Sequence, residues 1–164
     1  MSAYADLFQA LADRDLRFVV VGGVAVNLHG YSRFTNDIDL VIDLEPQHAL
    51  RFVRALLERG LQPLLPVNAE EFADPAIRDS WVTDRNLEVF SMHDPTNPLL
   101  VVDLFARPPI EFDLLWARAV RARIANAEIP IAAIEDLVRM KELAGRPKDE
   151  DDIRHLLRIL ERGT

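Results

Sequence analysis

The stretch Val19–Asp43, VVVGGVAVNLHGYSRFTNDIDLVID, decides the fold that we expect for this chain. It opens within an apolar run, Phe18–Val21, of the kind that forms a buried strand. Two glycines, Gly22 and Gly23, then allow a tight turn or the close approach of backbone to a ligand. The short apolar segment Val24–Leu28 follows and ends near another glycine, which predicts one or two turns of helix.

The second half of this stretch predicts a strand with two acids on one face. Asp37 and Asp39 alternate with the apolar residues Ile38 and Leu40. On a strand, this period of two puts both carboxylates on the same side, about 7 Å apart at the backbone. Because two acids on a buried strand repel each other and lose solvation, they require a positive neighbour. Magnesium is the usual partner of a set of ligands made of carboxylate oxygens.

A third acid, Asp103, lies alone in the later apolar run Leu99–Phe105. A charge in such a run is costly without a partner. We therefore expect Asp37, Asp39 and Asp103 to form a cluster that holds one or two magnesium ions against a nucleoside triphosphate. The structural alternative places Asp37 in a turn cap and pairs the other two acids with arginines.

Four residues between these elements are candidates for nucleotide binding. Gly22 and Gly23 before a helix suit a phosphate-binding turn. A glycine pair is also common in ordinary turns, and this chain lacks both the dinucleotide fingerprint and the Gly-Lys-Ser/Thr phosphate loop. Arg33 and Thr35 lie in the loop that leads to the acids. Arg33 is expected to bind phosphate or to organise the carboxylates, and its alternative role is a surface ion pair.

The C-terminal charges form a second group of candidates. Lys141 shares a helical stripe with three aliphatic residues, so we expect it to point inward. There it either neutralises a phosphate or extends past the core to solvent. We interpret Asp149 and Asp152 as a capping pair on the last helix. Arg146 and Lys148 are expected to be solvated unless a substrate reaches them.

Composition sets the class of protein. The 164 residues suit one domain, and the apolar fraction of 49% supports a proper core. The absence of cysteine excludes disulfides and thiolate zinc sites, and no signal pattern or membrane-spanning run is seen, so we expect a cytoplasmic protein. The net charge of −8 argues against bulk electrostatic coating of nucleic acid, but permits a local basic patch.

The histidines lack paired metal spacing and are interpreted as structural or surface residues: His29, His48, His93 and His155.

The order of helix and strand patterns predicts an α/β (α+β) fold, with a mixed sheet flanked by helices and two C-terminal helices. We expect a single domain, 1–164, made of a catalytic core, 1–131, and C-terminal helices, 132–164. Helices are predicted at Ala3–Asp13, from Pro46 to Gly60, in one or two pieces within Asn68–Arg85, and at Phe112–Ala119, Ala133–Leu143 and Glu150–Arg162. The remaining strands are predicted at Leu61–Val67 (an edge strand or extended loop), Leu87–Met92, Leu99–Phe105, Arg121–Ile124 and Ile129–Ile131.

The glycine pair, the pattern G-x-x-R-x-T-x-D-x-D over Gly30–Asp39 and the later acid together resemble the nucleotidyltransferase superfamily related to DNA polymerase β. Within it, the chain is similar to small bacterial proteins of the AbiEii/AbiGii-toxin-like kind, whose tail helices resemble the segment DLVRMKELAGRPKDEDDI. The resemblance implies that the glycine pair holds the triphosphate and that Asp37, Asp39 and Asp103 bind two magnesium ions. It also implies that Asp103 helps to activate the acceptor hydroxyl.

We therefore predict a metal-dependent nucleotidyltransferase that moves a nucleoside monophosphate from a nucleoside triphosphate to a hydroxyl of transfer RNA, protein or a small molecule. The resemblance further implies a toxin–antitoxin component with an antitoxin as its partner. The long RNA-binding extension of a CCA-adding enzyme does not fit after Asp103, whereas antibiotic-modifying relatives such as lincosamide nucleotidyltransferases stay an alternative. A different class is an inactive protein of this fold that binds a nucleotide or a partner. The three acids argue against that class, because a binding module has no reason to retain their desolvation cost.

Overall fold

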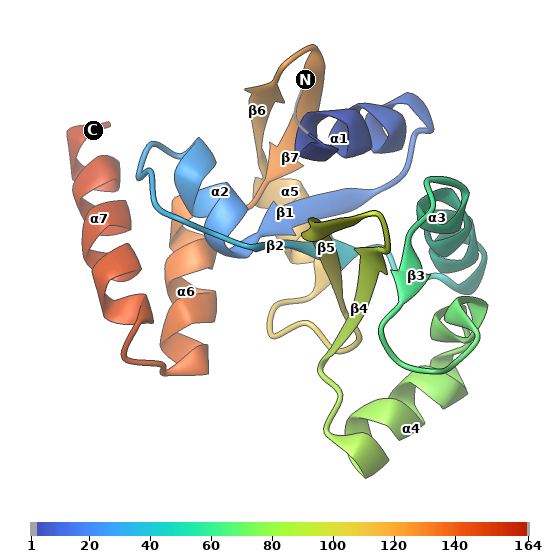
Figure 1. Cartoon of the computed structure of the whole chain (residues 1–164). Helices are drawn as coiled ribbons and strands as arrows, with labels where there is room; N and C mark the ends of the chain where they lie inside the picture. The colour runs from blue at the N-terminus through green and yellow to red at the C-terminus, as the bar shows by residue number, and fades with distance from the viewer. Residues whose placement is uncertain (1–2, 164) are drawn as a thin grey trace.

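The computed structural model describes residues 3–163, which form a mixed sheet flanked by helices (Figure 1). The strand order is β3-β4-β5-β2-β1-β7-β6. The strands are β1 (Phe18–Val21), β2 (Asp37–Ile42), β3 (Gln62–Pro63), β4 (Val89–Asp94), β5 (Asn97–Phe105), β6 (Val120–Ile124) and β7 (Ala127–Ile131). The expected fold class is therefore confirmed.

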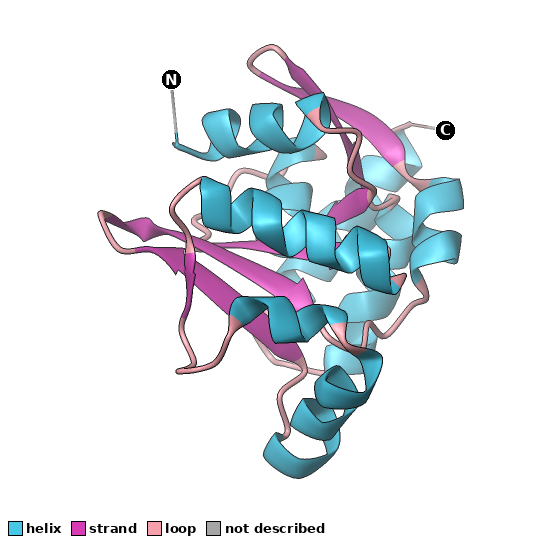
Figure 2. Cartoon of the chain, turned by 90° about the vertical axis from the view of Figure 1, so that its right-hand side faces the viewer, coloured by secondary structure: helices cyan, strands magenta, loops and turns pink. Residues whose placement is uncertain are grey.

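The helices lie close to the ranges predicted from the sequence. They are α1 (Ala3–Asp13), α2 (Gly22–Leu28), α3 (Pro46–Glu58), the 3-10 helix η1 (Ala69–Ala73), α4 (Pro75–Arg85), α5 (Phe112–Arg118), α6 (Ile134–Ala144) and α7 (Asp149–Arg162). Figure 2 shows α1 and α3 in front of the strands, and in Figure 1 the pair α6 and α7 lies on the opposite side of the sheet from α3 and α4. No helix among residues 3–163 is both long enough and apolar enough to cross a membrane.

Two helix starts show how local sequence sets these boundaries. The Glu45 side chain accepts hydrogen bonds from the first turn of α3, and the Asp74 side chain does the same for α4. In each helix a proline, Pro46 or Pro75, takes the first position, where its missing N–H costs nothing. Pro75 therefore divides this region into η1 and α4, in agreement with the prediction of one or two short helices.

The centre of the sheet is β2, and its registers position the candidate site. It runs antiparallel to β1, with Val21 opposite Asp39, and parallel to β5, with Asp39 beside Asp103. On the other face of the same strand, Ile38 and Leu40 are fully buried. This alternation anchors β2 through its apolar side chains while its acids face away from that side of the core.

The β4–β5 hairpin confirms the prediction of two strands around the turn at residues 93–98. Its antiparallel register places Ser91 directly opposite Asp103. The short strand β3 pairs with β4 at the edge of the sheet, as the two prolines of the predicted segment Leu61–Val67 suggested. The hairpin therefore gives Asp103 neighbours on both sides, Asp39 from β2 and Ser91 from β4.

Three of the four histidines contact residues outside their own helix or turn. The Arg17 backbone N–H donates a hydrogen bond of 2.8 Å to His48 Nε2, and His29 Nε2 lies 2.8 Å from the Ala132 carbonyl oxygen. The ring of His155 stacks on Tyr31 with centroids 3.8 Å apart. His93 lies within β4.

The predicted boundary between 1–131 and 132–164 falls between β7 and α6. Helix α6 ends at Gly145, whose φ of +63° is the left-handed conformation typical of a helix stop. The capping role that we assigned to Asp149 and Asp152 is wrong. Helix α7 has no side-chain capping hydrogen bond at its N-terminus, and both carboxylates are buried in ion pairs instead.

Candidate active site

The three predicted acids line one cleft with a volume of about 960 Å³. Asp39 and Asp103 are direct neighbours in the parallel strands β2 and β5, and Asp37 lies two residues before Asp39 on the same face. All three side chains are partly buried. The structure thus brings together residues that lie far apart in the sequence.

The acids carry more negative charge than their surroundings neutralise. Burial, followed by repulsion from Asp103 and Asp37, raises the pKa of Asp39 to about 7, against the opposing effect of Arg146 and Lys141. Burial likewise raises the pKa of Asp103, although a hydrogen bond from Ser91 favours its charged form. The Ser91 hydroxyl donates that bond to Asp103 Oδ1 over 2.5 Å. The site therefore stabilises an added positive charge.

The donor chemistry of this cluster fits a hard divalent cation such as magnesium, which prefers carboxylate oxygen. Within residues 3–163, no group of three or more histidine, aspartate or glutamate side chains is already arranged as a metal site. Burial and the neighbouring carboxylates of Asp103 and Asp37 raise the pKa of Asp39. A bound cation relieves the same repulsion that raises this pKa.

The glycine pair begins α2 and lies against the site. Gly22 has a φ of +66°, and a Cβ atom placed there would lie 2.0 Å from Asp39 Oδ2. A Cβ atom on Gly23 would lie 2.5 Å from Thr35 Oγ1. Both glycines and Thr35 line the cleft. Their small size is therefore required by the close approach of two side chains of the site, a reason that the sequence did not reveal.

The loop before β2 is held in place by a residue that the sequence analysis missed. The Asn27 side chain accepts a hydrogen bond of 3.0 Å from the Arg33 backbone N–H. It also donates a hydrogen bond of 2.9 Å to the Arg33 backbone carbonyl oxygen. Arg33 Nε then lies 2.8 Å from Asp152 Oδ1 on α7. The signal in the sequence was a single polar residue in the apolar segment VAVNL.

Lys141 points inward, as predicted, and is 6% exposed. Its Nζ lies 2.8 Å from Asp152 Oδ2 and 3.5 Å from Asp149 Oδ1. Arg146 binds Asp149 with two hydrogen bonds, of 2.8 Å from Nε and 3.1 Å from Nη2. These residues and Arg33 form a charge network that joins the loop before β2 to both C-terminal helices.

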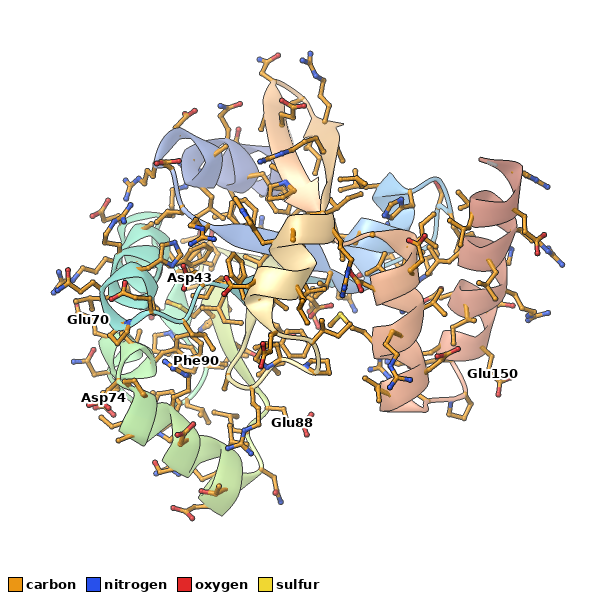
Figure 3. All side chains as sticks on the ribbon, turned by 180° about the vertical axis from the view of Figure 1, so that it is seen from behind. Asp43, Glu70, Asp74, Glu88, Phe90 and Glu150 are labelled. Carbon is orange, nitrogen blue, oxygen red and sulfur yellow. The ribbon has the colours of Figure 1, made fainter. Side chains whose placement is uncertain are left out.

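The cleft extends beyond the acids toward the start of β4. Glu88 and Arg107 line it there, and Phe34 lines it beside the acid-bearing loop. In the view of Figure 3, Glu88 lies at the start of β4 and Glu150 on α7, with α6 between them.

Comparisons with known proteins identify the family and the fold. The family model described as "Nucleotidyl transferase AbiEii toxin, Type IV TA system" matches residues 5–159. A comparison with curated protein sequences found no match.

Solved structures share the fold at low sequence identity. The lincosamide antibiotic adenylyltransferase LnuA, solved with lincomycin bound, is 14% identical with a TM-score of 0.64 over 97% of this chain and 98% of its own. ANT(2")-Ia in complex with adenylyl-2"-tobramycin is 15% identical with a TM-score of 0.60 over 97% and 90%. An antigenic nucleotidyltransferase-like protein from Paracoccidioides brasiliensis is 19% identical with a TM-score of 0.58 over 96% and 73%.

These structural similarities show the fold. The match to the family model, which covers nearly the whole chain, shows the family. The protein belongs to the AbiEii family of nucleotidyl transferase toxins of type IV toxin–antitoxin systems.

Proposed function

We propose that this protein is an active, metal-dependent enzyme that transfers a nucleoside monophosphate from a nucleoside triphosphate to the hydroxyl of an acceptor. The observation that supports this proposal is the pairing of Asp39 with Asp103 in adjacent parallel strands, beside Asp37, in a cleft of about 960 Å³. A protein that acted through binding alone would gain stability by losing one of these mutually repelling carboxylates.

In the proposed reaction, the acceptor hydroxyl oxygen forms a bond to the α-phosphorus of the triphosphate. The bond from that phosphorus to the oxygen bridging to the β-phosphate breaks, and pyrophosphate leaves with the electron pair. Asp103 accepts the proton of the attacking hydroxyl. Its raised pKa makes it a stronger base than an ordinary aspartate, and the hydrogen bond from Ser91 orients it.

Asp37, Asp39 and Asp103 are the residues that would hold a divalent cation. When bound, the cation supplies positive charge that offsets the carboxylates and the charge on the reacting phosphate oxygens. Asp39 is the central member of this set, since it adjoins Asp103 in the sheet and follows Asp37 on the same strand face.

The nucleotide-binding candidates keep their proposed roles around this centre. Gly22 and Gly23 keep the backbone free of side chains next to Asp39 and Thr35, so that a triphosphate can approach. Arg33 and Lys141 also line the cleft, and both pair with Asp152. A phosphate chain in this cleft would meet both the metal-holding acids and the positive charge of these two side chains.

The acceptor is a hydroxyl of transfer RNA, protein or a small molecule, and an antitoxin is the proposed partner protein. Incubation with each α-labelled nucleoside triphosphate, magnesium and an acceptor from each class tests the proposal. We expect labelled product and pyrophosphate from the unaltered protein. The double variant Asp37→Asn/Asp39→Asn should produce neither while keeping the same far-ultraviolet circular dichroism spectrum.

Two results of this assay would reject the proposal. Transfer that persists in the double variant would remove these acids from the chemistry. Binding of triphosphate without transfer to any acceptor would identify the protein as a nucleotide-binding module.

A further inference from the structure

Arg146, in the loop between α6 and α7, combines hydrogen bonds to a buried carboxylate with an exposed side chain. Its Nε and Nη2 bind the two carboxylate oxygens of Asp149 at 2.8 and 3.1 Å. The side chain of Arg146 is nevertheless 54% exposed, and it lines the cleft. A guanidinium has five N–H donors, so the pair with Asp149 leaves three for a ligand.

Asp149, the partner of Arg146, is itself buried and paired with a second cation. Asp149 is 2% exposed, and the buried Lys141 ammonium lies 3.5 Å from its Oδ1. Burial disfavours the charge of this carboxylate, but Arg146 and Lys141 outweigh that effect and hold the pKa of Asp149 below its usual range. A surface arginine normally loses much side-chain entropy when it binds an anion. Because Asp149 already restricts the Arg146 side chain, part of this entropy is lost before the anion binds.

Arg146 also lines the same cleft as the acids. Its charge lowers the pKa of Asp39, and the charge of Asp39 raises the pKa of Arg146 in return. By contrast, the Lys141 ammonium is buried between Asp149 and Asp152. Of these two cations, Arg146 is the one with donors that remain open to the cleft.

We propose that Arg146 binds the β- and γ-phosphates of the nucleoside triphosphate, the part that leaves as pyrophosphate, and that Asp149 positions it. This inference rests on the proposed function, because it requires a triphosphate between Arg146 and the acids. A planar guanidinium that keeps several donors suits two phosphate oxygens at once. Lys141 supports this arrangement through Asp149, in addition to the positive charge that it brings to the cleft.

Lys148 offers a matched control within the same loop. It lines the cleft and is exposed. Among residues 3–163, however, the structure gives it no ion pair, so nothing fixes its ammonium in place. If bulk positive charge alone attracted the triphosphate, removal of Lys148 would matter as much as removal of Arg146.

Isothermal titration of the full-length protein with ATP, inorganic tripolyphosphate and AMP, each with magnesium, tests the inference. We expect Arg146→Ala to weaken binding of ATP and of tripolyphosphate by about 10-fold to 100-fold, as for hydrogen bonds between charged groups. AMP lacks the β- and γ-phosphates, so its affinity should change by less than about twofold. Arg146→Lys should recover part of the loss and Lys148→Ala should bind like the unaltered protein, while Asp149→Asn should weaken tripolyphosphate binding without removing a phosphate contact.

Wild-type affinity of Arg146→Ala for tripolyphosphate would overturn the inference. An equal loss of AMP affinity would also overturn it, since it would indicate damage to the whole cleft, and thermal unfolding of each variant checks the fold directly. Failure of the proposed function gives a different pattern: the unaltered protein would bind triphosphate through Arg146 but transfer nothing. Transfer that proceeds with an unchanged KM for the triphosphate in Arg146→Ala would reject the inference and leave the proposed function standing.

Discussion

Asp39 and Asp103 occupy equivalent positions in the parallel strands β2 and β5 and are neighbours in the sheet. Ser91 lies on the other side of Asp103, at the opposing position of the β4–β5 hairpin. The two acids differ in their surroundings: burial and repulsion from Asp103 and Asp37 raise the pKa of Asp39, whereas Asp103 has Ser91 as a hydrogen-bond donor. The distinct surroundings of the two acids lead to distinct predictions.

Replacement of Asp103 by asparagine should lower kcat by about 100-fold to 10,000-fold, the usual contribution of a positioned proton acceptor. Ser91→Ala should have a smaller effect, because the carboxylate keeps its place in β5 and loses only the hydrogen bond to Oδ1. Steady-state kinetics with a saturating triphosphate would measure both. A loss in Ser91→Ala as large as that in Asp103→Asn would show that the serine itself takes part in the chemistry.

Asp39 should make the metal-free protein less stable as the pH rises. Its pKa is about 7 in the folded state, against 3.8 for an ordinary aspartate, because of burial and of the charges of Asp103 and Asp37, which Arg146 and Lys141 only partly offset. Below about pH 4 the group is protonated in both states. Between pH 4 and 7 the unfolded chain releases the proton more readily, so the stabilising contribution of the protonated carboxyl is lost by about pH 7.

Urea unfolding in the presence of a chelator, from pH 5 to pH 8, would measure this effect. Asp39→Asn should be more stable than the unaltered protein at pH 8 and should lose most of that advantage at pH 5. Added magnesium should stabilise the unaltered protein more at pH 8 than at pH 5, and should do little for the variant. A pH-independent difference between the two proteins would contradict the raised pKa of Asp39.

Gly22→Ala should destabilise the fold by about 2 to 4 kcal/mol, since it combines a strained backbone with an atom forced into a filled space. The space is filled by Asp39, whose Oδ2 would lie 2.0 Å from the new Cβ. Gly60→Ala is the matched control, because Gly60 also has a positive φ, of +89°, but nothing lies within 4 Å of a Cβ placed there. Thermal and urea unfolding of the two variants would separate backbone strain from the contact with Asp39. Equal losses would remove any special role for that contact.

Much of this site was predictable because its signals are local. The alternation of Asp37 and Asp39 with Ile38 and Leu40 marks one strand and its two faces. Asp103 stood out as a lone acid in an apolar run. Its place beside Asp39 depends on the parallel register of β2 and β5, which no local pattern encodes.

The C-terminal charges show where sequence patterns reach their limit. The spacing of Asp149 and Asp152 at a helix start is equally consistent with capping and with a buried ion-pair network. The choice depends on partners from other elements: Lys141 on α6 and Arg33 in the loop before β2. A helical stripe predicted that Lys141 points inward, but not that two buried acids would meet it there.

Loss of Asp152 should destabilise the protein strongly because it leaves two cations without a shared partner. Asp152 is 2% exposed, and its two oxygens lie 2.8 Å from Arg33 Nε and 2.8 Å from Lys141 Nζ. Removal of one member of a buried ion pair costs about 3 to 5 kcal/mol, since the remaining charge stays desolvated. We therefore expect Asp152→Ala to lose about that much stability in urea unfolding.

The neighbouring Asp151 provides the control for this prediction. Its side chain is 56% exposed and pairs with Arg154 on the surface of the same helix. Exposed pairs contribute about 0 to 1 kcal/mol, so Asp151→Ala should unfold almost like the unaltered protein. Lys141→Met in the Asp152→Ala background should recover part of the lost stability, because it removes a buried charge that keeps only the 3.5 Å contact with Asp149 and fills a similar volume. If the double variant is no more stable than Asp152→Ala, the uncompensated charge of Lys141 is not the source of the lost stability.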